Sequence, residues 1–447
     1  MLVLGKIFLF SFSCCLLTSL NQHAKAEDLI SIFKIAEQND PEFAAISASV
    51  MATREQRIQA RAGLLPNISF DANTTYNNQE IDTETGIGQT GDFNFNSRGY
   101  NLKLKQPLLR YDRWLTLKQS DQQILRAEAE QEFAFQDLLL RVSERYFRVL
   151  ESQDNLHFVL AEKIALERQA EETKLRYEAG FISDTDVQEA NAAYRNSLAE
   201  ELLAENELEN SRELLLEIVG SYETDLSKVR EDIPLINPNP ESVDEWVQFA
   251  LENNPELMLA ESQMVITHEE VGIQKAGHLP TLDFIVTTGN EVQGGRFGDT
   301  DIDSTSAGLQ LNIPLYSGGL VKSKTIQAQY LHLQAEHNYE RQKRAVFRET
   351  RDAYLGIKSG ISRIEALAIS IDASLSALNA TTAGFEAGTR TAVDVVSAER
   401  ELYRVKRDYA KARYGYLLNI LRLQKSVGLL VPADLKMING WLETGET

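Results

Sequence analysis

The sequence is poor in cysteine, in long hydrophobic runs and in positive charge. Its two cysteines, Cys14 and Cys15, both lie near the start of the chain. Disulfide frameworks and thiolate catalysis are therefore excluded for the remainder. After the first 26 residues no stretch offers the roughly 18 consecutive apolar residues that a spanning helix requires. The 45 Lys and Arg residues face 66 Asp and Glu residues, and the net charge of −21 disfavours nucleic acid as a partner.

The first 26 residues have the pattern of a secretory signal peptide. Lys6 precedes an apolar run over 7–20, and Ala24-Lys25-Ala26 is a small-x-small cleavage site. The sequence therefore predicts that 1–26 is removed and that the rest of the chain leaves the cytoplasm.

The remaining sequence contains the same unit twice, at an offset of roughly 200 residues, which indicates an internal duplication. Asn39-Asp40-Pro41-Glu42 returns as Asn253-Asn254-Pro255-Glu256, and Leu65-Pro66 returns as Leu279-Pro280. Because prolines end helices and are excluded from central strands, they mark element boundaries. We predict a first repeat over 27–220, a linker over 221–245, a second repeat over 246–428 and a C-terminal tail over 429–447.

Each repeat is expected to begin with helix and then to contribute two strands. After Pro66 the apolar period changes to two, with the alternate residues of 68–76 apolar. A polar loop is expected over 79–97, followed by a strand that Pro107 stops. In the second repeat, 282–288 and 307–313 alternate in the same way, and Pro314 stops the second of these strands. Strands of about ten residues suit a tilted membrane crossing.

Each repeat is expected to end in a long helical hairpin. Residues 113–179 contain neither Gly nor Pro, so they predict a helix about 100 Å long. Apolar residues at three- and four-residue steps favour coiled-coil packing. Gly180 would end this helix, and 185–219 would return antiparallel to it. In the second repeat 320–387 and 391–427 form the same hairpin, with Gly356, Gly360 and Gly384 expected to interrupt its first arm.

Four strands cannot close a barrel, and an open sheet edge in lipid leaves backbone groups without partners. At least two chains must therefore combine to reach the eight strands of the smallest barrels. The residues thus predict a hollow oligomer of α+β class, with strands in a membrane and long helices on one side of it.

The chain resembles the TolC-like outer membrane efflux proteins over nearly the whole mature sequence. The resemblance is carried by the duplicated element order, by Gln106-Pro107-Leu108 and Ile313-Pro314-Leu315, and by the hairpin sequence Ala387-Gly388-Thr389-Arg390-Thr391-Ala392-Val393-Asp394-Val395. It implies a homotrimer with a 12-stranded β-barrel in the outer membrane of a Gram-negative bacterium, continuous with a periplasmic α-helical barrel. It also implies a passive exit duct for efflux or type I secretion that docks to a periplasmic adaptor and an inner-membrane transporter.

The resemblance further implies a closed periplasmic end, held by links between hairpin tips and lined by acidic residues. Arg390 would be linked to Thr185 and Asp186, and Asp394 would form a ring that favours cations. This sequence departs from the family at Phe385, where a tyrosine can occur, and at Ser397, where a second acidic ring would lie. The expected gate residues are Thr185, Asp186, Phe385, Arg390, Asp394 and Ser397, and the expected adaptor contacts are Gly180, Phe181, Gly388 and Thr389.

Simpler interpretations of the same residues remain open. Arg390 and Asp394 could form an ordinary exposed pair one helical turn apart, and the tip glycines could serve only the chain reversal. A duct dedicated to protein secretion is one alternative function, and a periplasmic or surface scaffold or adhesin without a pore is another.

No enzyme, metal or cofactor site is predicted. The G-x-G-x-x-G match at 86–91 lies between strands with no helix after it, so it does not indicate a dinucleotide site. Asp299, Asp301 and Asp303 alternate like the start of a calcium loop but lack its glycine and distal glutamate, so a divalent site there is left open. No G-x-S-x-G nucleophile motif or H-E-x-x-H pair occurs. The sequence does not specify the cargo or the particular adaptor.

Overall fold

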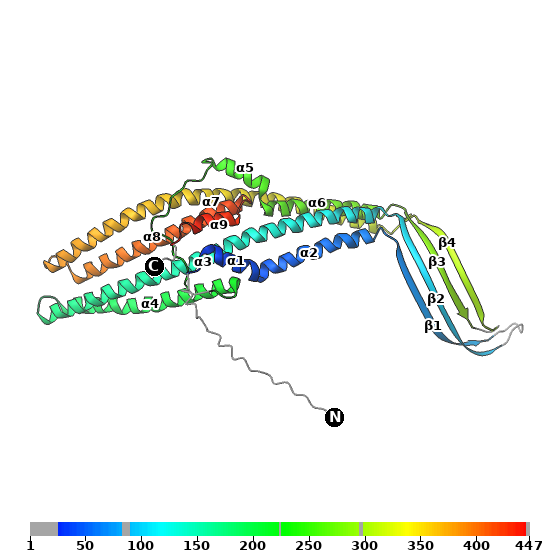
Figure 1. Ribbon diagram of the computed structural model, residues 1–447, viewed down its shortest axis with the longest axis horizontal. Helices are drawn as coiled ribbons and strands as arrows, with labels where there is room; N and C mark the ends of the chain where they lie inside the picture. Colours follow the sequence, from blue (N-terminus) through cyan, green and yellow to red (C-terminus); the bar gives the residue numbers. More distant parts are fainter. Residues whose placement is uncertain (1–25, 83–89, 223–224, 295–297, 444–447) are drawn as a thin grey trace, which may run out of the picture.

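The computed structural model describes residues 26–82, 90–222, 225–294 and 298–443. Paired helices form a long rod, and a four-stranded sheet lies at one end of it (Figure 1). The predicted signal peptide, apart from Ala26, lies outside the described residues, as does most of the G-x-G-x-x-G match. The elements in chain order are α1 (Leu29–Asn39), α2 (Pro41–Ala62), β1 (Asn67–Ile81), β2 (Gly91–Leu109), α3 (Tyr111–Glu178), α4 (Asp184–Val219), α5 (Val243–Asn253), α6 (Pro255–Ala276), β3 (Thr281–Gln293), β4 (Thr300–Asn312), α7 (Leu320–Glu386), α8 (Ala392–Ser426) and α9 (Pro432–Asn439).

The sheet is antiparallel, in the order β1-β2-β3-β4. The last strand pairs before the turns of its two hairpins are Ile81↔Gly91 and Gln293↔Thr300. Alternation gives each strand an apolar side, and Phe70 and Leu309 on these sides are 65% and 67% exposed in the single chain. Large apolar side chains that are exposed in this way are expected on the face of a sheet that contacts lipid.

Two sequence expectations about the first hairpin are wrong. Most of the described part of the polar loop expected over 79–97 is strand, because Asp92, Asn94 and Asn96 alternate with Phe93 and Phe95 and pair across to β1. Pro107 does not stop β2, which continues to Leu109. The register between β2 and β3 shifts between Pro107 and Leu109, and such an irregularity lets a sheet tolerate the missing proline N–H.

The long helices form as the sequence predicts, with 68 residues in α3 and 67 in α7. The expected interruption of the second hairpin is wrong, since α7 runs without a break through Gly356, Gly360 and Gly384. Close packing explains two of these glycines. A Cβ at Gly356 would lie 2.9 Å from the Asn419 side chain, and one at Gly384 would lie 2.7 Å from Arg390 Cγ.

The shorter helices meet end to end at two junctions. Asn39 Nδ2 donates to the Val219 carbonyl at 3.0 Å, where α4 ends and α2 begins. Asn254 Nδ2 donates to the Ser426 carbonyl at 2.8 Å, where α8 ends and α6 begins. Each bond satisfies a carbonyl that a helix C-terminus leaves without a partner. The helices α2 and α4 therefore follow one side of α3, and α6 and α8 lie between α3 and α7.

The main core lies midway along the rod, where α1, α5 and α9 pack against the long helices. Tyr146 is fully buried there, and its hydroxyl donates to the Ser227 carbonyl at 2.7 Å. Tyr416 is also fully buried, and its hydroxyl accepts from the Ile236 N–H at 2.7 Å. These two tyrosines attach the segment between the repeats to the rod. Among the described residues no helix is both long enough and apolar enough to cross a membrane.

Candidate functional site

The two hairpins reverse at glycines with positive φ, 79° at Gly180 and 74° at Gly388. The Phe181 N–H donates to the Arg176 carbonyl at 2.9 Å, which closes the end of α3. Phe181 itself is 81% exposed. The residues expected to meet an adaptor therefore lie exposed at the free ends of the hairpins, and they are Gly180, Phe181, Gly388 and Thr389.

Both return helices begin with a capping box, and this places the two predicted gate aspartates. Asp186 Oδ2 accepts from the Ser183 N–H at 3.2 Å and from its hydroxyl at 2.7 Å. Asp394 Oδ2 accepts from the Thr391 N–H at 2.9 Å and from its hydroxyl at 3.0 Å. Each carboxylate is thus held at a helix N-terminus, where the helix dipole favours negative charge.

The surroundings of Asp394 favour the ionised form of its carboxyl group. The hydrogen bonds from Thr391 lower the pKa of Asp394 below its usual value, and the nearby charge of Arg390 lowers it further. In the described part of the single chain no salt bridge joins Arg390 to Asp394, and no hydrogen bond joins Arg390 to Thr185 or Asp186. Thr185, Arg390 and Ser397 are exposed.

Phe385 is buried, in contrast to the other gate candidates. It packs with Ala392 and Val395 inside the second hairpin. The guanidinium of Arg176, from the first hairpin, lies 4.4 Å from the Phe385 ring centroid. Arg176 also donates to the Phe385 carbonyl at 3.4 Å. A cation over an aromatic face contributes attraction, so Phe385 joins the two hairpins near their tips.

Sequence reasoning missed a buried charged cluster between α3 and α8. Glu162 is 2% exposed, and it accepts from Arg407 at 2.8 Å and lies 3.8 Å from Arg400. Glu399 is half-buried beside it, and burial together with the charge of Glu162 raises the pKa of Glu399 to about 7. No local signal reveals this cluster, because its members come from distant parts of the chain.

Comparison with known proteins gives one consistent result. The outer membrane efflux protein family matches residues 32–221 and 246–429. The chain is 32% identical over 445 residues to the outer membrane protein TolC of Vibrio cholerae, covering 97% of this chain and 98% of that protein. It is 27% identical over 426 residues to the proteases secretion protein PrtF of Dickeya chrysanthemi, covering 94% and 92%. The CmeC outer membrane channel of Campylobacter jejuni superposes with a TM-score of 0.76 at 16% identity, covering 93% and 90%.

A four-stranded sheet carried on two long helical hairpins is the subunit fold of outer membrane channels. The chain belongs to the outer membrane efflux protein family. It is an outer membrane exit duct of the TolC type, the kind used in efflux and type I secretion, and its helical part lies in the periplasm. The family, the fold class and the location predicted from the sequence are thereby confirmed.

Proposed function

We propose that this chain works as a homotrimer whose twelve strands form one barrel and whose hairpins form one helical conduit. The open sheet carries this proposal. Within the described residues β1 and β4 each pair on one side only, and in lipid such an edge costs several kcal/mol for each unpaired backbone group. Pairing β4 of one subunit with β1 of the next removes every edge.

The conduit is proposed to be passive and to perform no catalysis. Direction and energy would come from an inner-membrane transporter, reached through a periplasmic adaptor. The exposed tips at Gly180, Phe181, Gly388 and Thr389 are the proposed adaptor contacts, because they lie at the end of the rod opposite the sheet (Figure 1). The repeats 27–220 and 246–428, joined by 221–245, would supply two similar hairpins per subunit.

A duct dedicated to protein secretion is a second candidate. The full-length similarity to the Dickeya chrysanthemi proteases secretion protein favours it. A strain that lacks its own exit duct separates the two functions when complemented with this chain, because restored drug resistance and restored secretion are scored independently.

Trimer formation and conduction test the proposed function together. Unheated outer membrane extracts should contain a species that migrates well above the denatured chain and dissociates on boiling. After reconstitution into a planar bilayer, that species should conduct ions. A monomeric species that stays in the soluble periplasmic fraction and does not conduct would instead support a scaffold.

Replacement of Arg390 by Ala should raise the single-channel conductance. We propose that the exposed guanidinium links to Thr185 and Asp186 of a neighbouring hairpin when the tips converge, because it has no ion-pair partner in the described part of one chain. Removing a charge-assisted link weakens closure by about 1.5 to 3 kcal/mol, which is roughly tenfold or more in the open population. Arg404→Ala on α8, the helix that follows Arg390, is the control, since Arg404 pairs with Glu401 within that helix. An unchanged conductance for Arg390→Ala would refute the link.

A further inference from the structure

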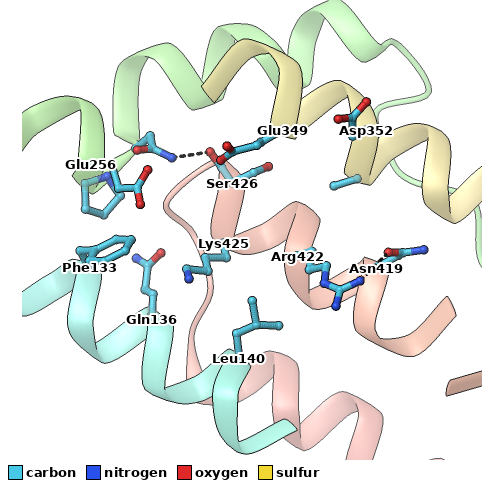
Figure 2. A pocket seen from close by; sticks show the side chains of 13 residues that line it. Phe133, Gln136, Leu140, Glu256, Glu349, Asp352, Asn419, Arg422, Lys425 and Ser426 are labelled. Carbon is cyan, nitrogen blue, oxygen red and sulfur yellow. Dashed lines mark hydrogen bonds between the residues drawn. The ribbon is translucent and has the colours of Figure 1, made fainter. Parts of the chain in front are cut away.

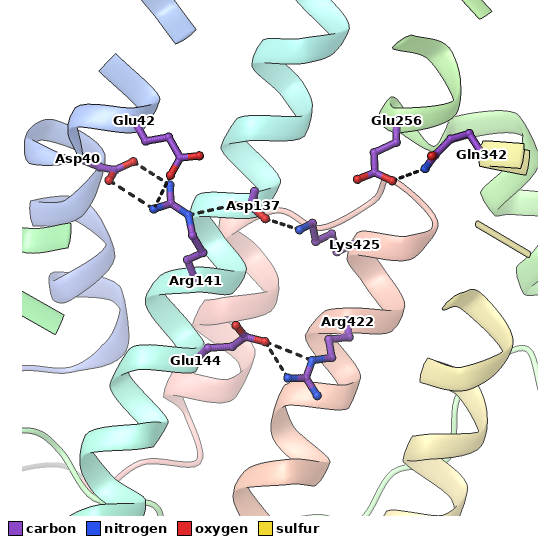
Figure 3. Close-up of polar contacts among 9 residues, drawn as sticks. All are labelled: Asp40, Glu42, Asp137, Arg141, Glu144, Glu256, Gln342, Arg422 and Lys425. Atoms are coloured by element: carbon purple, nitrogen blue, oxygen red, sulfur yellow. Dashed lines mark hydrogen bonds and ion pairs between the residues drawn. The ribbon is translucent and has the colours of Figure 1, made fainter. Parts of the chain in front are cut away.

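The two helix junctions differ in charge. At the first junction, Arg141 from α3 lies 2.8 Å from Asp40 and 3.1 Å from Glu42, both at the start of α2 (Figure 3). Asp137 accepts from the same guanidinium at 2.8 Å. Arg141 therefore supplies a cation that is shared by three carboxylates at this junction.

The second junction lacks that cation. Glu256 follows Pro255 as Glu42 follows Pro41, so a carboxylate occupies the corresponding place. Glu349 stands as far before Gly388 as Arg141 stands before Gly180, and it therefore replaces the arginine in the second repeat. Burial raises the pKa of Glu256, and the charge of Glu349 raises it further. Two acidic groups thus meet where the first junction has an ion pair.

A pocket of 390 Å³ opens at this second junction, between α3, α6, α7 and α8 (Figure 2). Glu349 and Asp352 lie exposed at its α7 side, and Glu256 is half-buried at its α6 side. Phe133 and Leu140 provide an apolar wall. Its volume is in the range of small-molecule sites. We call this space the junction pocket.

The basic side chains of the junction pocket are already paired. Lys425 Nζ donates to Asp137 at 2.5 Å, and Arg422 donates to Glu144 at 2.7 Å (Figure 3). Arg348 lies 3.0 Å from Glu349, but both side chains are more than half exposed. Such a pair between neighbouring surface residues contributes little. Negative charge therefore predominates in the space.

Gln136 gives a second, independent sign of a ligand. It lines the junction pocket and is 1% exposed. Its Nε2 donates to Glu132 at 2.8 Å and to the Gly428 carbonyl at 2.9 Å. Its Oε1 has no hydrogen-bond partner among the described residues. Buried acceptors are nearly always satisfied, so a donor is missing from this site.

We propose that the junction pocket binds a small organic cation with an ammonium or guanidinium head on an apolar body. The head would donate to Glu256 and to Gln136 Oε1, and the body would pack on Leu140, because Lys425 Nζ already lies over the Phe133 ring, 5.0 Å from its centroid. A bare metal ion fits less well, because no cluster of three or more His, Cys, Asp or Glu side chains in the described residues is arranged to hold one. The inference goes beyond the exit-duct function and does not depend on it.

Phenethylammonium is a suitable probe because it carries one primary ammonium on an aromatic body. Calorimetric titration of the full-length protein in nanodiscs at pH 8 should detect its binding. The isosteric neutral 2-phenylethanol should bind at least about tenfold more weakly, because it lacks the charge-assisted hydrogen bonds. Phenylacetate should not bind. Equal affinity for the three probes would overturn the proposal, since it would indicate partition by hydrophobicity alone.

Two variants test the site itself. Glu349→Arg restores the arrangement of the first junction, so the arginine should pair with Glu256 and reduce phenethylammonium affinity at least about tenfold. Gln136→Leu removes the unpaired acceptor and should also weaken binding. Glu365→Arg is the matched control, because it makes the same charge reversal at an exposed position of α7 far from the pocket. Unchanged affinity in Glu349→Arg, or an equal loss in Glu365→Arg, would overturn the proposal.

The outcome can be separated from the exit-duct function. Conductance of the unmodified protein tests the duct, and titration tests the junction pocket. A conducting protein that does not bind phenethylammonium refutes the pocket alone, and a binding protein that does not conduct refutes the duct alone.

Discussion

A Gly428→Ala variant is expected to lose about 3 kcal/mol or more of unfolding free energy and to accumulate poorly in the outer membrane. Gly428 has a φ of +72°, which costs an alanine about 1–2 kcal/mol. A Cβ at this position would also lie 2.2 Å from the Asn253 carbonyl oxygen. That oxygen belongs to the backbone, so it cannot move without shifting the α8–α6 junction, and such overpacking adds about 1–3 kcal/mol.

Gly220 provides a matched control for this substitution. It occupies the corresponding place after α4, with a φ of +76°, but no atom lies within 4 Å of its added Cβ. Gly220→Ala should therefore cost only the strain of its positive φ, about 1–2 kcal/mol. Midpoints of chemical denaturation for the two purified variants give the comparison. Equal midpoints would show that the clash with Asn253 is relieved without cost.

Replacement of Glu162 by Gln should destabilise the contact between the two hairpins by about 2 kcal/mol. Glu162 accepts from Arg407 and lies near Arg400, and it is almost fully buried. Removing one partner of a buried ion pair costs up to about 5 kcal/mol. The smaller value applies because the two arginine side chains are 26% and 41% exposed and water can partly solvate them. The thermal unfolding midpoint at pH 8 measures the loss.

Glu399→Gln should have the opposite effect, and its effect should depend on pH. The pKa of Glu399 is raised from 4.5 to about 7, so the folded protein favours the protonated carboxyl. The stabilisation that comes from this preference for the protonated carboxyl is fully present below about pH 4.5. It is lost as the pH rises through about 7. Glutamine keeps the neutral form, so it should stabilise the protein at pH 8 by about 1 kcal/mol after allowance for solvent screening. At pH 4.5 the two proteins should unfold alike. A stabilisation independent of pH would exclude titration of Glu399 as the cause.

Much of the fold could be predicted because its signals are local. Proline and glycine positions end the helices near Gly180 and Gly388, and alternation over 68–76 locates β1. The errors arose where a tertiary contact overrides the local preference of a residue. A glycine occurs at position 356 inside α7 because α8 packs too closely there for a side chain. Pro107 stays within β2 because the register with β3 shifts beside it. Neither the close helix packing nor the register shift can be inferred from neighbouring residues in the sequence.

The candidate sites were predicted less completely, for a related reason. The tip residues were found because a resemblance and a turn signal coincide at Arg390 and Gly388. The Glu162–Arg407 pair joins residues 245 positions apart, and no periodicity links them. The missing cation at Glu349 is visible in the sequence only after the two repeats are aligned and Arg141 is known to form an ion pair.

The two end-to-end junctions also impose an order on folding. The Asn39–Val219 bond joins residues of the first half only, so a chain that emerges N-terminus first can complete α2, α3 and α4 before the second half is available. The sheet has no such freedom, because β2 must wait for β3, which begins more than 170 residues after β2 ends. Closing so long a loop is slow. The first helical hairpin is therefore expected to mature before the sheet, and the sheet, whose last strand ends at Asn312, to become available before the second hairpin of α7 and α8.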